Sequence, residues 1–416
     1  MLRVFNYRFY LSEFCILFFT YLFSEGVFSW LVVPNSQVKE MYDKVLSLFI
    51  YGFMLYSYKK LRKDEKIYIF LFTLLIIKLV FESLYLYGNF FKQFTLFTVI
   101  YPVVYVVFIK YICRSLDFDL LEFVAKFYLF AYIIFMVMYG RGFSFSLAMV
   151  DMEDYGPFSG DSRIIHARSI LMLTIPYLWY LSRYLQTKKI INLLVFFFCF
   201  AIILIHQHRS VWSSTIFATL VFILLTVKSN KKTVSGFYNL TLVCLVILAL
   251  GVFYISSLYP NFLNFMADRF SEIFNPEKEG STGNFRIEQT QIYGEFIKQR
   301  PILGWSFQGF SLRNPLVDWW DENTGQHFHE GFVEILFYHG IVGLILKYSF
   351  LVIIFIKAFT QKLSNEAIIL VSFCLCGLLF SLSYVLPIVF WAHVGLCLYY
   401  LERKKKADDL QSYNSI

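Results

Sequence analysis

Long apolar runs separated by short polar linkers make up most of the chain. A helix of about 20 apolar residues can cross a bilayer, and a window of that length finds about twelve such runs. The predicted membrane-spanning helices lie at 10–33, 42–58, 67–88, 94–112, 120–140, 167–184, 188–206, 211–228, 237–258, 330–358, 366–383 and 386–401. Because a helix satisfies its own backbone hydrogen bonds inside lipid, this pattern predicts an all-α integral membrane protein.

One long polar stretch, residues 259–328, interrupts the apolar pattern. Its part from Gly283 to Arg300 has apolar residues at helical spacing and is followed by Pro301, so it predicts an amphipathic helix. The stretch therefore predicts a large, partly helical loop outside the bilayer. The expected division of the chain is helices 1–9 in residues 1–258, the loop in residues 259–329, and helices 10–12 with a basic tail in residues 330–416.

The composition is that of a membrane protein. Of the 416 residues, 58% are hydrophobic, 21% are aromatic and 16% are charged, whereas soluble domains carry about 25% charged residues. No cleavable signal peptide is expected, because the first apolar segment lacks a small-residue cleavage site after a short core. The formal net charge of +8 does not indicate nucleic-acid binding, since the basic residues gather in short linkers between apolar runs.

Those basic linkers set the expected topology, because short cytoplasmic loops are enriched in Lys and Arg. With the N-terminus in the cytoplasm, every second linker is basic and lies on the cytoplasmic side. The basic residues on that side include Lys59, Lys60, Lys110, Arg114, Arg183, Lys188, Lys228, Lys357 and the tail 403–406. The loops 141–166 and 259–328 then face the periplasm of a bacterial inner membrane, and both termini are cytoplasmic.

Neither the cysteines nor the histidines predict a metal centre. All seven cysteines lie in or beside apolar runs, which suits packing residues. His327 and His329 are two residues apart, but a zinc site usually needs third and fourth ligands at recognisable spacing. No metal and no cofactor is therefore expected.

Two arginines stand out as candidate anion-binding residues. Arg209 lies where one apolar run ends and the next begins. An arginine at that depth is costly unless it faces water or an anion, although it could also reach lipid headgroups beside Trp212. Arg286 lies near the start of the amphipathic helix, where the helix dipole disfavours a cation. Either an anionic partner or a solvated surface position would explain it.

His329 lies at the end of the polar loop, just before an apolar helix and beside Glu330. A histidine pKa lies near working pH, so this position suits a general base. Glu334 is one helical turn beyond Glu330 and should face the same cleft.

Two further polar sets are candidates for substrate binding. Arg163 and His166 belong to a mixed group in the loop 141–166 that suits sugar hydroxyls. Lys78 lies one helical turn from Glu82 inside an expected span, where the two side chains can also simply pair.

Three short motifs between residues 200 and 345 carry a family resemblance. The first is His208-Arg209-Ser210-Val211-Trp212, similar to an (S/T)-R element at the outer end of a span. The second is Gly283-Asn284-Phe285-Arg286 with Arg300-Pro301-Ile302-Leu303-Gly304, similar to a G-x-R and P-x-x-G pair. The third is His329-Glu330 with Gly340 and Gly343, similar to an H-N-x-x-L and G-x-x-G pair. In these motifs the chain resembles the O-antigen ligase and O-antigen polymerase superfamily of membrane glycosyltransferases. Glu330 stands where that family usually has Asn, and His208 where it often has Ser or Thr.

The resemblance implies roles for the matching residues. Arg209 and Arg286 would bind the diphosphate of an undecaprenyl-diphosphate-linked glycan and stabilise it as it leaves. His329 would deprotonate the acceptor hydroxyl for an inverting attack. Further substrate-binding candidates are Arg163, His166, His327, Glu330, His208 and Lys78. The reaction would need no metal, because the arginines would do the work of a divalent ion.

The resemblance leaves the acceptor open. We expect a polymerase that extends lipid-linked repeat units, because the H-x-H-N-E form of the ligases is incomplete in residues 327–330. The alternative is a ligase that moves the glycan onto lipid A core. A flippase for lipid-linked sugars is a third interpretation, which predicts charged residues on broken helices at mid-membrane. The expected partners are the lipid-linked donor and acceptor, membrane lipid and a chain-length regulator, with no nucleic acid.

Overall fold

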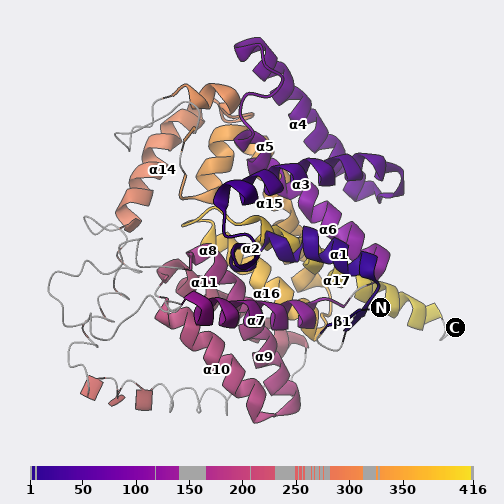
Figure 1. Ribbon diagram of the computed structural model, residues 1–416, viewed down its shortest axis with the longest axis vertical. Coiled ribbons are helices and arrows are strands. Elements are labelled where there is room, and N and C mark those ends of the chain that lie inside the picture. Colours follow the sequence, from indigo (N-terminus) through magenta and orange to yellow (C-terminus); the bar gives the residue numbers. More distant parts are fainter. Residues whose placement is uncertain are drawn as a thin grey trace.

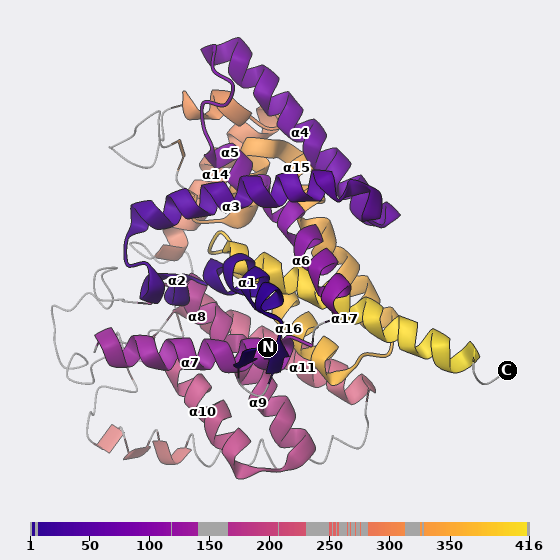
Figure 2. The same cartoon turned by 45° about the vertical axis from the view of Figure 1, so that its right-hand side comes forward.

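The computed structural model is a bundle of packed helices (Figures 1 and 2). It describes residues 2–4, 7–117, 119–139, 165–206, 208–229, 282–312, 325, 326 and 328–413, together with isolated positions between 249 and 275. The expected all-α class holds for these residues, apart from a short hairpin at the start of the chain. That hairpin pairs β1 (Leu2–Val4) with β2 (Tyr7–Phe9) in antiparallel register.

The first expected span, 10–33, is not one straight helix. It forms α1 (Leu11–Thr20), η1 (Leu22–Ser24) and α2 (Gly26–Val32), and the chain bends by 110° between the first part and α2. Glu25 stabilises the start of α2, because its carboxylate accepts a 2.7 Å hydrogen bond from the backbone N–H of Phe28. An acidic N-cap is a helix start signal, which the apolar window overlooked.

The remaining helices follow the apolar pattern closely. They are α3 (Ser36–Tyr56), η2 (Tyr58–Lys60), α4 (Lys63–Tyr87), α5 (Thr95–Ile100), α6 (Pro102–Leu116), α7 (Leu121–Tyr139), α8 (Ala167–Ile170), η5 (Leu171–Leu173), α9 (Thr174–Thr187), α10 (Ile190–Ile205), α11 (Arg209–Ser229), α14 (Thr282–Gln299), η7 (Ser306–Phe310), α15 (Gly331–Thr360), α16 (Asn365–Phe380) and α17 (Ile388–Tyr413).

By length and apolar character, fewer helices than expected could each cross a membrane. Among the described residues, α4, α7, α11 and α15 meet both criteria, and the bent pair of α1 and α2 would make a fifth. Helices α10 and α16 are apolar but shorter. The expected span 237–258 lies almost entirely outside the described residues. The chain thus has several membrane-capable helices, while the count of twelve spans is not confirmed.

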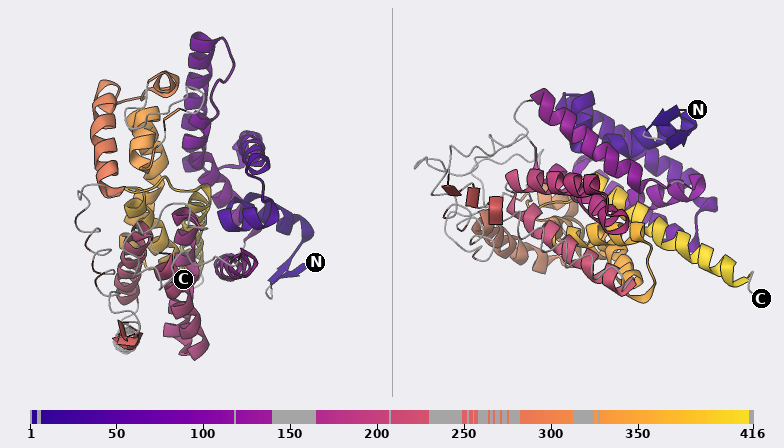
Figure 3. Two further views of the ribbon diagram at one scale, coloured as in Figure 1. Left: turned by 60° about the vertical axis from the view of Figure 1, so that its left-hand side comes forward. Right: turned by 90° about the horizontal axis from the view of Figure 1, so that it is seen from below.

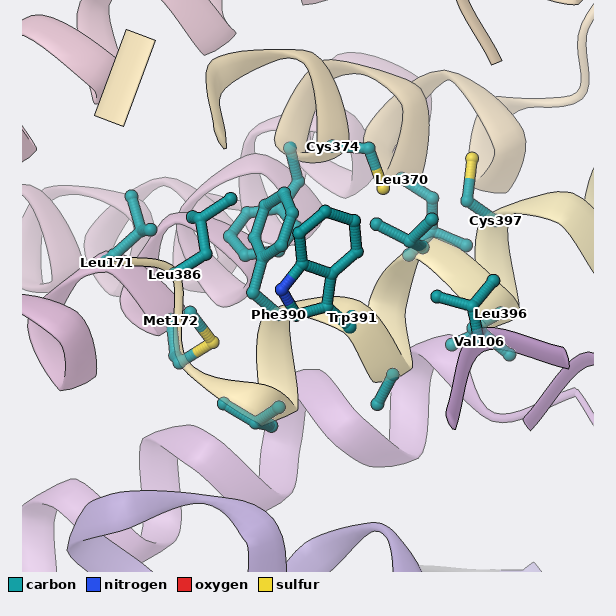
Figure 4. Close-up of a cluster of buried hydrophobic side chains, with 14 of the residues drawn as sticks. Val106, Leu171, Met172, Leu370, Cys374, Leu386, Phe390, Trp391, Leu396 and Cys397 are labelled. Atoms are coloured by element: carbon teal, nitrogen blue, oxygen red, sulfur yellow. The ribbon is translucent and has the colours of Figure 1, made fainter. Parts of the chain in front are cut away.

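The buried core lies around α16 and α17. Figure 4 shows side chains of α6, η5, α16 and α17 gathered about the indole of Trp391, which is fully buried. Small residues let these helices approach closely, as is usual in membranes. A β-carbon added at Gly377 would overlap the ring of Phe390, and one at Gly395 would lie 2.7 Å from the carbonyl oxygen of Val106. Cys374 and Cys397 are buried here as packing residues.

Among the described residues, the ion pairs that join different helices gather at one end of the bundle. The ammonium group of Lys110 lies 3.0 Å from Asp64 and 2.7 Å from Glu402, which brings together α6, α4 and α17. The guanidinium of Arg183 on α9 lies 3.2 Å from the carboxylate of Glu122 on α7. Several of the basic linkers therefore meet at this end, which we call the ionic end. Lys357 near the end of α15 lies 3.5 Å from Glu402, and Lys228 near the end of α11 donates to the carbonyl of Phe359 at 2.6 Å. Because α9, α11 and α15 end here, the starts of α8, α11 and α15 lie away from it.

Helix α15 is broken at Gly340, where the backbone has φ 62° and ψ −161°. A straight helix would separate Gly331 from Tyr348 by about 25 Å. Instead, a β-carbon on Gly331 would lie 3.0 Å from the Tyr348 hydroxyl, and the rings of Phe332 and Tyr348 are 4.6 Å apart. Residues 331–339 therefore fold back on the rest of α15. The expected span 330–358 agrees with a helix that is long and apolar enough to cross a membrane, but this helix is interrupted at Gly340, which adopts a conformation that a regular helix cannot contain.

The segment 301–305 packs onto this break. The N–H groups of Ile341 and Val342 donate to the carbonyls of Pro301 (2.8 Å) and Ile302 (3.2 Å). In return, the N–H of Trp305 donates to the carbonyl of Phe337 at 2.7 Å. These bonds satisfy backbone groups that an interrupted helix leaves unpaired. The two glycine-containing motifs of the sequence are thus one structural unit.

Replacing Gly340 by Ala should destabilise the protein. The new β-carbon would overlap the carbonyl of Ile302, and residues other than Gly rarely adopt this backbone conformation. Together these two effects should lower the free energy of unfolding by roughly 2–4 kcal/mol. Thermal unfolding in detergent should show a lower midpoint for Gly340→Ala. Gly52→Ala in α3, where an added β-carbon meets open space, should leave the midpoint unchanged or raise it. Equal midpoints for Gly340→Ala and wild type would contradict this account.

Candidate active site

Helix α14 lies against the first half of α15 (Figures 1 and 3). Its bounds, Thr282–Gln299, agree with the amphipathic helix expected between Gly283 and Arg300. Aromatic rings hold the pair together, since the ring of Tyr293 lies 5.3 Å from that of Phe337 and 4.7 Å from that of Phe328. This contact positions the start of α14 beside the start of α15.

Arg286, the fifth residue of α14, has an aromatic partner. Its guanidinium carbon lies 5.1 Å from the centre of the Tyr384 ring, in the segment that joins α16 to α17. A cation over the face of a tyrosine ring is attracted to it. Arg286 also acts electrostatically on Glu330. The anionic partner expected for Arg286 is therefore at least partly supplied by the protein itself.

His329 and Glu330 are held by α14. The backbone N–H of His329 donates to the side-chain oxygen of Gln289 at 3.1 Å, and its ring meets Phe285 edge-on at 5.5 Å. The imidazole of His329 remains exposed. The hydroxyl of Thr290 donates to the carboxylate of Glu330 at 2.5 Å. Burial raises the pKa of Glu330, while the Thr290 hydrogen bond and the charge of Arg286 partly lower it.

A second set of contacts connects the start of α11 to Tyr384, the residue that Arg286 also contacts. The Nε2 of His208 lies 3.0 Å from the carbonyl oxygen of Ile165, so Nε2 donates its proton there. The next residue, His166, places its ring 6.3 Å from the ring of Tyr384. Tyr384 therefore contacts both His166 and Arg286. Arg209 directly follows His208 as the first residue of α11 and is half-buried.

Residues 194–348 match the protein-family model described as O-antigen ligase. This part of the chain is therefore similar to O-antigen ligases. The matched range includes Arg209, Arg286, His329 and Glu330, and it ends within α15. Proteins of this family are membrane glycosyltransferase-like enzymes, so the resemblance drawn from the motifs is confirmed at the level of the superfamily. No curated protein matches the chain.

Other predicted site residues lie apart from this place or beyond the described structure. Lys78 forms a 2.7 Å ion pair with Glu82 and a hydrogen bond with the hydroxyl of Ser306. It therefore pairs within α4, as one interpretation expected, and ties α4 to the segment that packs on the break of α15. Arg163 and His327 lie outside the described residues. Among all the residues that the structure describes, no three His, Cys, Asp or Glu side chains gather as metal ligands.

The residue patterns of the sequence did not single out Tyr384, Gln289 or Arg168. Tyr384 stands in a short polar break between two apolar runs, and nothing in its spacing connects it with the O-antigen ligase motifs. Arg168 begins an expected span, so the burial argument made for Arg209 applies equally to it. That signal was present and could have been used.

Replacing Glu330 by Gln should change how stability depends on pH. Because the folded-state pKa is raised, the carboxyl contributes its full stability below its unfolded pKa of about 4.3. This contribution is lost as the pH rises through the raised folded-state pKa. From pH 4 toward neutral, wild type should therefore lose thermal stability relative to Glu330→Gln. The Thr290→Val variant lacks the hydroxyl that lowers the pKa of Glu330. Its loss of thermal stability should therefore extend to higher pH than in wild type. Parallel profiles for wild type and Glu330→Gln would show that burial of Glu330 has no such effect.

Proposed function

We propose that this protein is a polysaccharide polymerase of the O-antigen type. It transfers an undecaprenyl-diphosphate-linked glycan to the acceptor hydroxyl of another lipid-linked repeat unit. One observation carries the proposal. Within the segment that matches the O-antigen ligase model, Arg286, His329 and Glu330 converge where α14 and α15 begin.

The proposed reaction is a single displacement. His329 takes the proton of the acceptor hydroxyl, whose oxygen then bonds to the anomeric carbon of the donor glycan. The bond from that carbon to the diphosphate oxygen breaks, and its electron pair leaves with the lipid diphosphate. Arg209 and Arg286 stabilise the leaving group, because guanidinium groups match phosphate oxygens in charge and geometry. Attack from the opposite face inverts the anomeric configuration.

The remaining polar residues have supporting roles in this proposal. Glu330 and His166 lie within reach of the groups just named and bind sugar hydroxyls. Arg163 and His327 remain candidates for the same role on sequence grounds. His208 orients the start of α11 through its bond to the carbonyl of Ile165.

We place the ionic end in the cytoplasm, because short cytoplasmic loops collect Lys and Arg. His329 and Arg286 then face the periplasm of a bacterial inner membrane, and both termini lie in the cytoplasm. In this topology the membrane helices occupy residues 1–258 and 330–416, and residues 259–329 form the large periplasmic loop.

A ligase that transfers the glycan onto lipid A core is the second candidate, and the description of the matching family favours it. Donor chemistry and site would be the same, and only the acceptor differs. We rank the polymerase first because Glu330 replaces the Asn of the ligase motif. The identity of the acceptor then decides between the two.

In cells that lack the wild-type gene, His329→Ala should insert normally but fail to transfer glycan. Losing a general base typically costs about 10²–10⁴-fold in rate. If the protein is a polymerase, a lipopolysaccharide gel should show core capped by a single repeat unit, because a separate ligase still works. Bare core, with full-length glycan left on the lipid carrier, would identify the ligase instead. A normal ladder would rule out His329 as the base.

The control for this experiment is Lys298→Ala, on the exposed side of α14. Its ladder should be normal. His339, the histidine of α15, is a poor control. Its ring is buried and lies 3.0 Å from the carbonyl of Leu96, so replacing it would disturb packing. Western blots of membrane fractions should show equal amounts of each variant.

Transfer should not depend on a divalent cation. The purified protein, given an undecaprenyl-diphosphate-linked repeat unit as donor and acceptor, should form polymer equally well with and without EDTA. The reason is that arginines supply the positive charge that a metal ion supplies in many glycosyltransferases. Activity that is lost on chelation and restored by Mn²⁺ or Mg²⁺ would overturn this part of the mechanism and make His327 and His329 candidate ligands.

A further inference from the structure

Arg168, on α8, lies close to the candidate site but has no role in the mechanism above. Its Nε atom is buried and, among the described residues, has no hydrogen-bond partner. Its guanidinium interacts electrostatically with Glu334 of α15 and with Tyr384. Tyr384 is the residue whose ring lies under Arg286. Arg168 follows His166 by two residues at the start of α8, and the ring of His166 lies 6.3 Å from that of Tyr384. The positions of Arg168 and Arg286 therefore both lie near Tyr384, on different helices.

Glu334 is the acidic neighbour of Arg168. Its Oε2 atom is buried and also has no hydrogen-bond partner within the described structure. Lys347, further along α15, is a second cation that acts on Glu334. Its ammonium group donates to the carbonyl of Val99 at 2.9 Å. Arg168, Glu334 and Lys347 thus carry a net charge of one positive unit beneath the site.

An ion pair that serves only stability would close to hydrogen-bonding distance. Leaving a buried charged group without its hydrogen bonds is costly, and ionisable residues within membrane bundles are retained mainly for function. Arg168 and Glu334 stay apart, and each residue is only half-buried, so each keeps surface that a ligand can reach. The buried Nε donor without a partner and the net positive charge both favour an anion.

We propose that Arg168 is a further binding residue of this site and donates to the diphosphate of the lipid-linked donor. This inference rests on the proposed function. Arg168 and Arg286 bind the same diphosphate, and the charge of Glu334 attracts the guanidinium of Arg168 without a hydrogen bond between them. The fork of an arginine suits this task better than a lysine ammonium, because it can donate two parallel hydrogen bonds to phosphate oxygens.

Direct binding of undecaprenyl diphosphate to the full-length protein in detergent, measured by microscale thermophoresis, tests the inference. Arg168→Gln should bind at least tenfold more weakly than wild type, with an unchanged thermal midpoint. Arg183→Gln is the matched control, since Arg183 lies on the neighbouring helix α9 but at the ionic end, and it should bind like wild type. If Arg168→Gln does not fold, the binding of undecaprenyl diphosphate to Arg168→Lys tests the inference instead. Lysine keeps the positive charge but lacks the two parallel N–H donors of the guanidinium group. Arg168→Lys should bind about threefold more weakly, and wild-type affinity would overturn the inference.

Inorganic pyrophosphate, titrated in the same way, separates the lipid-linked ligand from free diphosphate. Weaker binding of both probes to Arg168→Gln supports a site that free diphosphate can enter, and weaker binding of the lipid alone supports a site that only the carrier reaches. Unchanged binding of both overturns the role of Arg168. The Arg286→Gln variant keeps the two proposals apart. If wild type binds no undecaprenyl diphosphate, or Arg286→Gln binds it normally, the proposed function itself fails.

Discussion

Two backbone hydrogen bonds across the break in α15 hold together the region that contains the candidate site, where α14 and α15 begin. The N–H groups of Ile341 and Val342 would have no partner at this interruption without the carbonyls of residues 301 and 302. An unpaired backbone group in a membrane costs several kcal/mol, so the break and the docked segment exist only together. The docked segment fixes the end of α14, and the aromatic contacts of α14 then place Arg286 beside the start of α15.

Around that start, one aromatic side chain connects elements that are far apart in sequence. Tyr384 lies between α16 and α17, yet it contacts Arg286 from α14 and His166 from the start of α8. The guanidinium of Arg168 acts on it as well. A tyrosine offers a ring face that attracts cations and a hydroxyl that can hydrogen-bond. It can therefore keep several positive groups close to one another without neutralising them, which a carboxylate could not do.

The sequence predicted helices well and helix breaks poorly. Apolar runs marked α4, α7 and α11 to within a few residues, and the spacing before Pro301 marked α14. Apolar content does not report backbone conformation, so the bend at Glu25 and the break at Gly340 were overlooked. The break depends on partners more than 35 residues earlier in the chain, which no local window can detect. For the site, motif resemblance singled out Arg286 and His329, while Arg168 and Tyr384 become visible only when separate helices are brought together.

The fold-back of residues 331–339 also constrains how the protein is made. The insertion machinery meets residues 331–360 as one continuous apolar stretch of 30 residues, long enough to enter the bilayer as a single span. Nothing in that stretch alone can pair the backbone groups at Gly340. In the proposed topology, the break can form only after residues 301–305 have crossed the membrane and packed in place. Assembly of the candidate site would then be a late step of biogenesis, separate from membrane insertion, and a chain caught between the two would be fully inserted but would lack the assembled site.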